Sequence, residues 1–192
     1  MPTPHFSSED ILQNQWDAFC TAISKFEQQL HLTSSEFQCD HAAIRVNSIE
    51  QADALRVFFE NRSKIISENI INGRPILIFK LDQPLDLNGK PVACVELPYP
   101  NDKRYPIESW EHIELVIPSN ATSCPQLLQD IKRFNPELAT IIESPSADIK
   151  VKISSPKGEN ERLPNPTIAL KKDNICIKLH PHSIQDIIAS EQ

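Results

Sequence analysis

Glycine is scarce in this chain of 192 residues, and its three copies, Gly73, Gly89 and Gly158, stand far apart. A phosphate-binding loop needs several glycines close together, so that its backbone N–H groups can surround the phosphates. The sequence therefore disfavours ATP- or NAD-dependent chemistry on a standard nucleotide-binding fold.

Closely spaced cysteines are absent as well. The five cysteines are odd in number, and none of them stands in a CxxC spacing. Zinc knuckles and redox dithiols use cysteines at such short spacings, so neither is expected. We interpret the cysteines as small hydrophobic residues of the interior.

The chain also lacks long apolar runs and an excess of positive charge. Its apolar runs are only a few residues long, whereas a membrane span needs about 20 residues. No charged and then apolar leader opens the sequence, so we expect a cytoplasmic protein. The 19 basic residues are outnumbered by 26 acidic ones, which gives a net charge of −7. Nucleic-acid binding requires a basic surface, so we expect neither a membrane nor a nucleic-acid partner.

Two repeated stretches are the main positive feature of the sequence. Residues 40–46 and 111–117 begin with an acid and a histidine, Asp40-His41 and Glu111-His112, and both continue into aliphatic residues. Residues 93–98 resemble residues 175–180 position by position. Two echoes in the same order indicate a duplicated unit. A chain of this length with 40% hydrophobic residues fits one domain or two half-sized modules.

The predicted elements repeat too, as a strand, a helix and three strands. The hydrophobic periodicity predicts a helix over 7–31 and then, for the first unit, a strand at 40–47, a helix at 49–61 and strands at 64–69, 76–81 and 90–97. For the second unit it predicts a strand at 111–117, a helix at 125–134, strand-like stretches at 140–143 and 149–154, a final strand at about 167–179 and a short helix at 183–190. The polar segment 155–166 is long enough for a lid.

These elements divide the chain into four parts, and the predicted fold class is α+β. We expect an N-terminal helical extension at 1–36, a first module at 37–98, a proline-rich connector at 99–109 and a second module at 110–192. The short helix ends the second module, and the N-terminal helix is expected to pack against the main core.

Alternate residues of a strand share one face, and this rule collects the functional side chains. Each of the four echoing strands has one aliphatic face and one polar face, and the polar faces carry His41, Arg45, Glu96, His112, Glu114, Lys178 and His180. If these faces converge, they supply two or three imidazoles and one or two carboxylates, a ligand set for Zn, Fe, Mn or Ni. The alternative is a structural charge network, with Arg45 and Lys178 paired to Glu96 or Glu114.

Longer motifs resemble one family over nearly the whole chain. They are Asp40-His41, Asn72-Gly73-Arg74-Pro75-Ile76, Phe79-Lys80-Leu81, Glu96-Leu97-Pro98, Lys103-Arg104-Tyr105-Pro106, Trp110-Glu111-His112-Ile113-Glu114, Ser154-Ser155-Pro156-Lys157-Gly158-Glu159, Glu161-Arg162-Leu163-Pro164-Asn165-Pro166 and Lys178-Leu179-His180-Pro181. With these motifs the sequence resembles the YecM family of bacterial proteins and, more broadly, the vicinal oxygen chelate superfamily, which includes glyoxalases, extradiol dioxygenases and bleomycin-binding proteins. The resemblance implies two β-α-β-β-β modules whose sheets curl into an open barrel around one cavity, with an added N-terminal helix.

In that superfamily the metal ligands come from the first and last strands of each module. The resemblance therefore implies His41, Glu96 and His112 as ligands of a divalent metal. The fourth ligand would fall on Lys178, whose ammonium group cannot bind a cation. Two residues on the same faces could complete the shell instead, Glu114 and His180. Alternatively, Lys178 pairs with Glu96 and the cavity stays free of metal, as in the binding-only members of the superfamily.

Two functional hypotheses stay open at this point. The first is a metal-dependent enzyme of the lyase, isomerase or dioxygenase type that acts on a small, anionic, oxygen-bearing substrate. Its catalytic residues would be Glu114 and His180, and its substrate would be bound by Arg45, Arg74, Lys157, Arg162 and Lys178. The second is a metal-free protein that binds or sequesters a small molecule, which Lys178 favours. Surface salt links are the alternative for Lys157 and Arg162, and a protein-interaction module would rest on the N-terminal helix alone.

Overall fold

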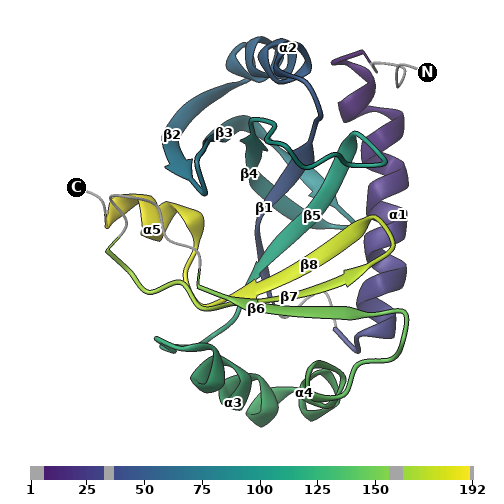
Figure 1. Cartoon of the computed structure of the whole chain (residues 1–192), viewed down its shortest axis with the longest axis vertical. Helices are drawn as coiled ribbons and strands as arrows, with labels where there is room; N and C mark the ends of the chain where they lie inside the picture. Colours follow the sequence, from purple (N-terminus) through teal and green to yellow (C-terminus); the bar gives the residue numbers. More distant parts are fainter. Residues whose placement is uncertain (1–6, 33–36, 156–161, 191–192) are drawn as a thin grey trace.

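One curled β-sheet of eight strands runs through the structure (Figure 1). The computed structural model describes residues 7–32, 37–155 and 162–190. The strands follow one another across the sheet in the order β2-β3-β4-β1-β5-β8-β7-β6. The four strands of each sequence repeat are neighbours, so each half of the sheet corresponds to one module.

The first module has the predicted order of one strand, one helix and three strands. It consists of β1 (Gln38–Arg45), α2 (Ile49–Glu60), β2 (Ser63–Ile71), β3 (Arg74–Leu87) and β4 (Lys90–Pro98). Ser48 caps α2, because its side chain accepts a hydrogen bond from the Gln51 N–H at 3.1 Å. Asn72 and Gly73 both have positive φ, as the tight hairpin between β2 and β3 requires.

The second module repeats this order with one additional helix. It consists of β5 (Ser109–Val116), α3 (Cys124–Phe134), α4 (Pro136–Glu143), β6 (Lys150–Ser154), β7 (Thr167–Lys172) and β8 (Ile175–His180), and α5 (Ile184–Ala189) follows. In each module the first strand runs parallel to the last, β1 beside β4 and β5 beside β8. β1 and β5 are antiparallel and join the two modules. The predicted α+β fold with two paired modules in a curled open sheet is confirmed.

Some of the predicted elements are wrong. Residues 140–143 lie in α4 and not in a strand, because Asn135 caps this helix by accepting a hydrogen bond from the Leu138 N–H at 3.0 Å. Residues 167–179 form the two strands β7 and β8, since Asp173 has a φ of 51° and turns the chain between them. The predicted helix 7–31 begins as a separate 3-10 turn, η1 (Asp10–Leu12), and continues as α1 (Asn14–Gln29).

The aliphatic face of the sheet and the helices α1 to α4 enclose the main hydrophobic core. Trp16 and Phe19 of α1 pack against Trp110 of β5, with ring centroids 4.7 and 6.2 Å from the Trp110 ring. The N-terminal helix is therefore part of the core, as predicted. In the part of the chain that the structure describes, no helix is both long enough and apolar enough to cross a membrane.

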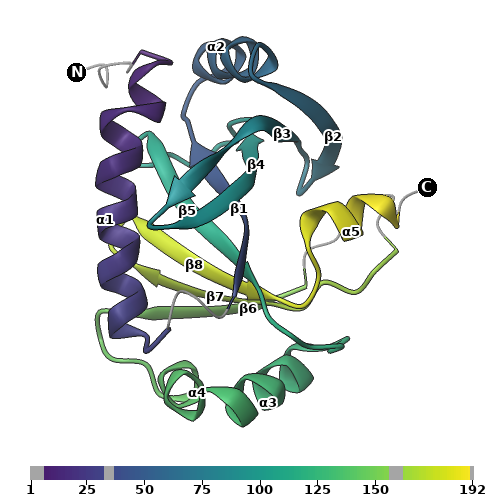
Figure 2. The ribbon, with the colours of Figure 1, turned by 180° about the vertical axis from the view of Figure 1, so that it is seen from behind.

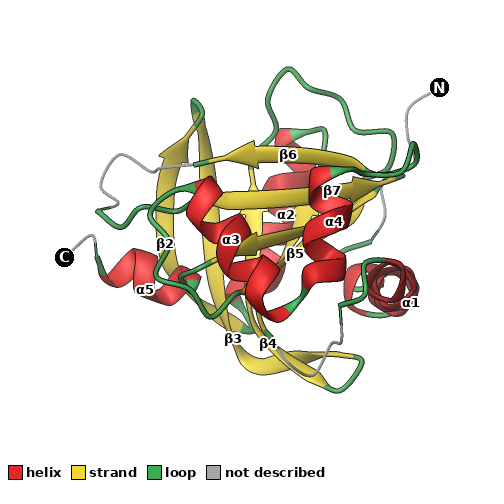
Figure 3. Cartoon of the chain, turned by 90° about the horizontal axis from the view of Figure 1, so that it is seen from below, coloured by secondary structure: helices red, strands yellow, loops and turns green. Residues whose placement is uncertain are grey.

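The opposite face of the sheet, which we call the inner face, packs against α5. Ile184 and Ile188 of α5 lie on Ile76, Ile78 and Cys94 of β3 and β4. Figure 2 and the view from below in Figure 3 place α1 and α5 on opposite sides of the molecule. The inner face carries the polar side chains of the echoing strands, as the alternation predicts.

Candidate metal centre

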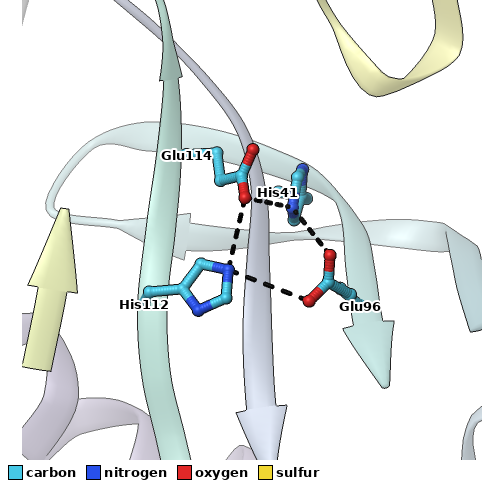
Figure 4. Close-up of side chains that lie close together, drawn as sticks. All are labelled: His41, Glu96, His112 and Glu114. Carbon is cyan, nitrogen blue, oxygen red and sulfur yellow. Dashed lines mark ion pairs between the residues drawn. The ribbon is translucent and has the colours of Figure 1, made fainter. Parts of the chain in front are cut away.

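Three adjacent strands bring predicted polar residues together at the middle of the inner face (Figure 4). His41 of β1 lies opposite Glu114 of β5. Ala43 of β1 lies between Glu96 of β4 and His112 of β5. Because residues that are paired across strands point to the same face, the imidazoles and carboxylates share one space.

The four side chains hold their candidate ligand atoms within 4.8 Å of one another. Glu114 Oε1 lies 3.5 Å from His41 Nε2 and 3.4 Å from His112 Nε2. Glu96 contacts the same rings, with Oε2 3.5 Å from His41 Nε2 and Oε1 3.8 Å from His112 Nε2. Two imidazole nitrogens and two carboxylates around one point could hold a metal ion.

A β-bulge turns an acidic residue towards each histidine. The register between β1 and β5 shifts at two places, which leaves Asp40 on one strand and Glu111 on the other without a partner. Asp40 Oδ2 lies 2.9 Å from His41 Nδ1, and Glu111 Oε2 lies 2.8 Å from His112 Nδ1. A carboxylate can only accept a hydrogen bond, so each Nδ1 donates, and the Nε2 atom of each ring points to the centre, where a metal ion would take the place of any proton on it.

The Nε2 atoms of His41 and His112, which point to the centre, show whether the centre fits a metal ion. Both rings are almost fully buried, and their Nε2 atoms hydrogen-bond to no residue in the described ranges. Buried polar atoms in proteins normally have a partner. Two buried Nε2 atoms that point at one position, between two carboxylates, fit a divalent metal ion.

The net charge of the side chains around the centre also favours binding of a cation. Four carboxylates and two cationic side chains border it: Asp40, Glu96, Glu111 and Glu114, and Arg45 and Lys178. This set carries two negative charges in excess when the histidines are neutral. Buried charges are costly unless they are compensated, and one divalent cation would neutralise this excess.

Both cationic side chains pair with carboxylates, as expected for the structural charge network that the sequence analysis gave as the alternative. Lys178 Nζ donates to Glu114 Oε1 at 3.0 Å. Arg45 Nη1 lies 3.5 Å from Glu96 Oε1, and its Nε lies 3.0 Å from Glu111 Oε2. Lys178 therefore contacts Glu114, and not Glu96, most closely, which leaves Glu96 facing the histidines.

The electrostatics favour positive charge between the carboxylates. Burial alone would lower the pKa of His41, but the charge of Glu114 and hydrogen bonding to Asp40 raise it well above its ordinary value. Burial alone would raise the pKa of Glu114, but the charges of Lys178 and His41 hold it well below its ordinary value. Burial alone would raise the pKa of Glu96 as well, but the close contact with His41 and the charge of Lys178 lower it. The carboxylates are therefore ionised and available as ligands.

His180 contacts Glu114 through the carboxylate oxygen that does not face His41 and His112. Its Nδ1 lies 3.4 Å from Glu114 Oε2, and its Nε2 lies 3.6 Å from Asp40 Oδ2. Burial lowers the pKa of His180, so the ring is neutral at pH 7. Asp40 Oδ2 also accepts a hydrogen bond from the Ile184 N–H at 2.8 Å, which ties α5 to this side of the centre.

Two other predicted substrate-binding residues, Arg74 and Arg162, make their hydrogen bonds away from the centre. Arg74 donates to the Tyr99 carbonyl oxygen at 3.5 Å. Arg162 is exposed, and its backbone N–H donates to Ser190 Oγ at 3.2 Å. Lys157 and half of the predicted lid, residues 156–161, lie outside the described residues.

Cysteines stand beside both histidines at equivalent positions. Cys94 lies opposite His41, and Cys176 lies opposite His112. Burial raises the pKa of Cys94 to about 11 and that of Cys176 to about 12, so both are neutral thiols. Their burial agrees with the prediction that they act as small hydrophobic residues.

Sequence reasoning gave no role to Asp40 and Glu111. The repeated acid–histidine pair marked both residues. Strict alternation, however, would place each acid on the face opposite its histidine. Only the two bulges bring the acids to the rings, and nothing in the alternation pattern reveals a bulge.

Comparisons with known proteins identify the relatives of the chain. A family model described as YecM protein matches residues 8–191. Protein YecM of Escherichia coli strain K12 is 40% identical over 177 residues, which are 91% of this chain and 89% of that protein. A protein of Haemophilus influenzae is 35% identical over 186 residues, 91% of this chain and 94% of the relative. A solved structure, the structural-genomics protein EC4020, matches with a TM-score of 0.80 and 34% identity, covering 100% of both chains.

Proposed function

We propose that this chain, which belongs to the YecM family, binds one divalent metal ion on the inner face and uses it to act on a small, oxygen-bearing substrate. The ligands are His41, His112, Glu96 and Glu114. The observation that carries the proposal is the pair of buried Nε2 atoms that make no hydrogen bond within the described residues, while the Nδ1 atom of each ring is held by a carboxylate.

The ligand set indicates which ions suit the centre. Imidazole together with carboxylate is typical of Zn, Fe, Mn and Ni sites, whereas the absence of a thiolate ligand disfavours soft ions. When bound, such an ion supplies Lewis acidity that polarises a substrate oxygen. An enzyme of the lyase, isomerase or dioxygenase type would use this chemistry.

The residues of the chain have separate tasks in this proposal. Glu111 and Asp40 fix the orientation of the imidazoles through Nδ1. Lys178 lies next to Glu114 Oε1 and provides positive charge beside the substrate oxygens. His180, neutral and within 3.4 Å of Glu114 Oε2, is the candidate for holding a proton near the centre.

One observation favours a second candidate, a metal-free binding protein. The ammonium of Lys178 already lies 3.0 Å from a carboxylate oxygen that would serve as a ligand. A protein that sequesters a small anion would use Lys178 and Arg45 directly, with the carboxylates holding these cations in place.

Metal analysis distinguishes the two candidates. The protein is purified without a chelator and without a histidine tag, and its metal content is measured by mass spectrometry. We expect about one equivalent of a transition metal per chain, lost in His41→Ala and in His112→Ala, because each substitution removes one of four ligands. The native protein should also melt at a higher temperature when Zn²⁺ or Mn²⁺ is added.

His31→Ala is the matched control, since His31 is exposed and pairs with Glu137, which is also exposed. It should retain the metal and the thermal shift. Circular dichroism verifies that the variants are folded. Metal content that is unchanged in both His41→Ala and His112→Ala, with no thermal shift on adding divalent ions, would rule out the proposal and leave the binding protein.

A further inference from the structure

The two modules differ at three equivalent positions in a row that leads away from the metal centre. In the first module the row runs across β4, β3 and β2 through Glu96, Ile78 and Ser67. In the second module the equivalent row runs across β8, β7 and β6 through Lys178, Ala169 and Lys152. Where the first module has an acid, a large aliphatic residue and a serine, the second module has lysine, alanine and lysine.

The row of the first module is closed by α5. Ile78 is 3% exposed and packs with Ile184 and Ile188 of this helix. In the second module, Ala169 is partly exposed and Lys152 is exposed, and the side chain of Lys178 is 24% exposed. The row of the second module is thus more exposed than the row of the first module, and it leads from the edge strand β6 to Lys178, which contacts Glu114.

A further lysine lies beside this row. Lys171 lies on β7 opposite Cys176, one row along from Ala169 and on the same face. Within the described residues, neither Lys152 nor Lys171 forms an ion pair. Three lysines around one alanine are a local concentration of positive charge on a chain whose net charge is −7.

We propose that Lys178, Lys171 and Lys152, around Ala169, form an anion subsite for a carboxylate or phosphate group of the ligand. We call these residues the lysine row. The inference rests on the proposed function, because the other end of the ligand binds the metal centre through its oxygens. It defines the substrate class as a small molecule with a chelating oxygen pair and a second, separate anionic group.

The strand spacing sets the size of this ligand. Neighbouring strands lie about 5 Å apart, and β8 and β7 are the first and second strands beyond β5. An anion above Ala169 therefore lies about 5 to 10 Å from Glu114, a distance that a few covalent bonds span. A competing explanation exists for Lys152, because lysines on an edge strand such as β6 discourage pairing with other chains.

The experiment compares two probes that differ only in the second anionic group. Glycerate carries a chelating hydroxyl and carboxylate, and 3-phosphoglycerate carries the same pair and a phosphate. Both are titrated into protein loaded with Co²⁺, and binding is followed by the visible spectrum of the ion and by calorimetry. We expect 3-phosphoglycerate to bind about tenfold or more tightly than glycerate, because the phosphate meets two or three ammonium groups.

The modules provide matched variants. Lys152→Gln and Lys171→Gln should each remove most of the preference for 3-phosphoglycerate and leave the affinity for glycerate unchanged. Ala169→Ile, which installs the kind of side chain that Ile78 provides in the first module, should block the phosphate in the same way. The controls are Lys64→Gln and Lys80→Gln, which remove the lysines at the positions of the first module that correspond to Lys150 and Lys171.

Two outcomes would overturn the lysine row: equal affinity of native protein for both probes, or equal losses in the variants and the controls. If Lys152 only prevents the edge strand β6 from pairing with other chains, the native protein should bind both probes with equal affinity. Failure of the metal centre is seen separately, because the protein would then not take up Co²⁺ at all. In that case the lysine row is tested with inorganic phosphate on metal-free protein, where Lys152→Gln must weaken binding and Lys64→Gln must not.

Discussion

At the scale of single residues, the acid before each histidine is the feature that the sequence showed without explaining. The alternation of polar and aliphatic residues was sufficient to place His41, Glu96, His112 and Glu114 on one face. It could not place Asp40 or Glu111, because a bulge depends on how two strands pair and not on either strand alone. The carboxylate that fixes each ring was therefore visible only in the structure.

The role of these acids leads to a prediction for Glu111→Gln. Glu111 accepts the Nδ1–H of His112 at 2.8 Å and also lies 3.0 Å from Arg45 Nε. The substitution removes a charge that makes the imidazole a better ligand and holds its orientation. We expect metal affinity to fall about 10- to 100-fold, as is typical of such outer-shell changes. Competition with a chromogenic chelator measures the loss.

Glu50→Gln is the control, because Glu50 is an exposed acid in the first turn of α2. It should bind metal like the native protein. If Glu111→Gln also binds metal with native affinity, Glu111 only balances the charge of Arg45 and does not position His112.

At the scale of helices and strands, the predictions from sequence were correct where the local pattern and the surrounding structure favour the same element. The prediction failed at residues 140–143, where Thr140, Ile141 and Ile142 have strand propensity. The structure places them in α4, because Asn135 and Pro136 start a helix just upstream and the packing against the core favours it. Local propensity is a weak guide when a cap and a buried face oppose it.

Asn135 provides a test of this explanation. Its side chain caps α4 by accepting the Leu138 N–H and donates to the His31 carbonyl oxygen at 3.0 Å. Asn135→Ala should lower the free energy of unfolding by about 1 to 2 kcal/mol, measured by urea denaturation. Asn135→Ser retains a capping oxygen and should lose less than half of this. Equal losses in both variants would show that capping does not stabilise α4.

At the scale of the whole molecule, the duplication explains both what was predictable and what was not. The two histidines, and the positions of Glu96 and Lys178, follow from the repeat. The second carboxylate does not, because Glu114 stands where the first module has Ala43. The acid of the second module has thus moved from the last strand to the first, and only the convergence of β1, β4 and β5 shows that it completes the same centre.

This exchange predicts the behaviour of Lys178→Glu, which restores the symmetry of the two modules. With neutral histidines, as metal binding requires, the centre has two negative charges in excess, and the substitution raises the excess to four. Metal affinity should therefore rise about tenfold or more, with Lys178→Met between the native protein and Lys178→Glu. Without metal, the new carboxylate faces Glu114, so the free energy of unfolding should fall by about 1 to 3 kcal/mol.

The two effects are measured on the same samples, by chelator competition and by thermal unfolding in the presence and absence of a chelator. Lys64→Glu, on the exposed edge strand of the first module, makes the same change of charge far from the centre and should alter neither property by much. Because Lys178 Nζ is only 3.0 Å from Glu114 Oε1, a glutamate at this position would lie next to the proposed ion and change its binding. Weaker metal binding in Lys178→Glu than in the native protein would mean that this side chain does not face the ion, and the four-ligand centre would have to be abandoned.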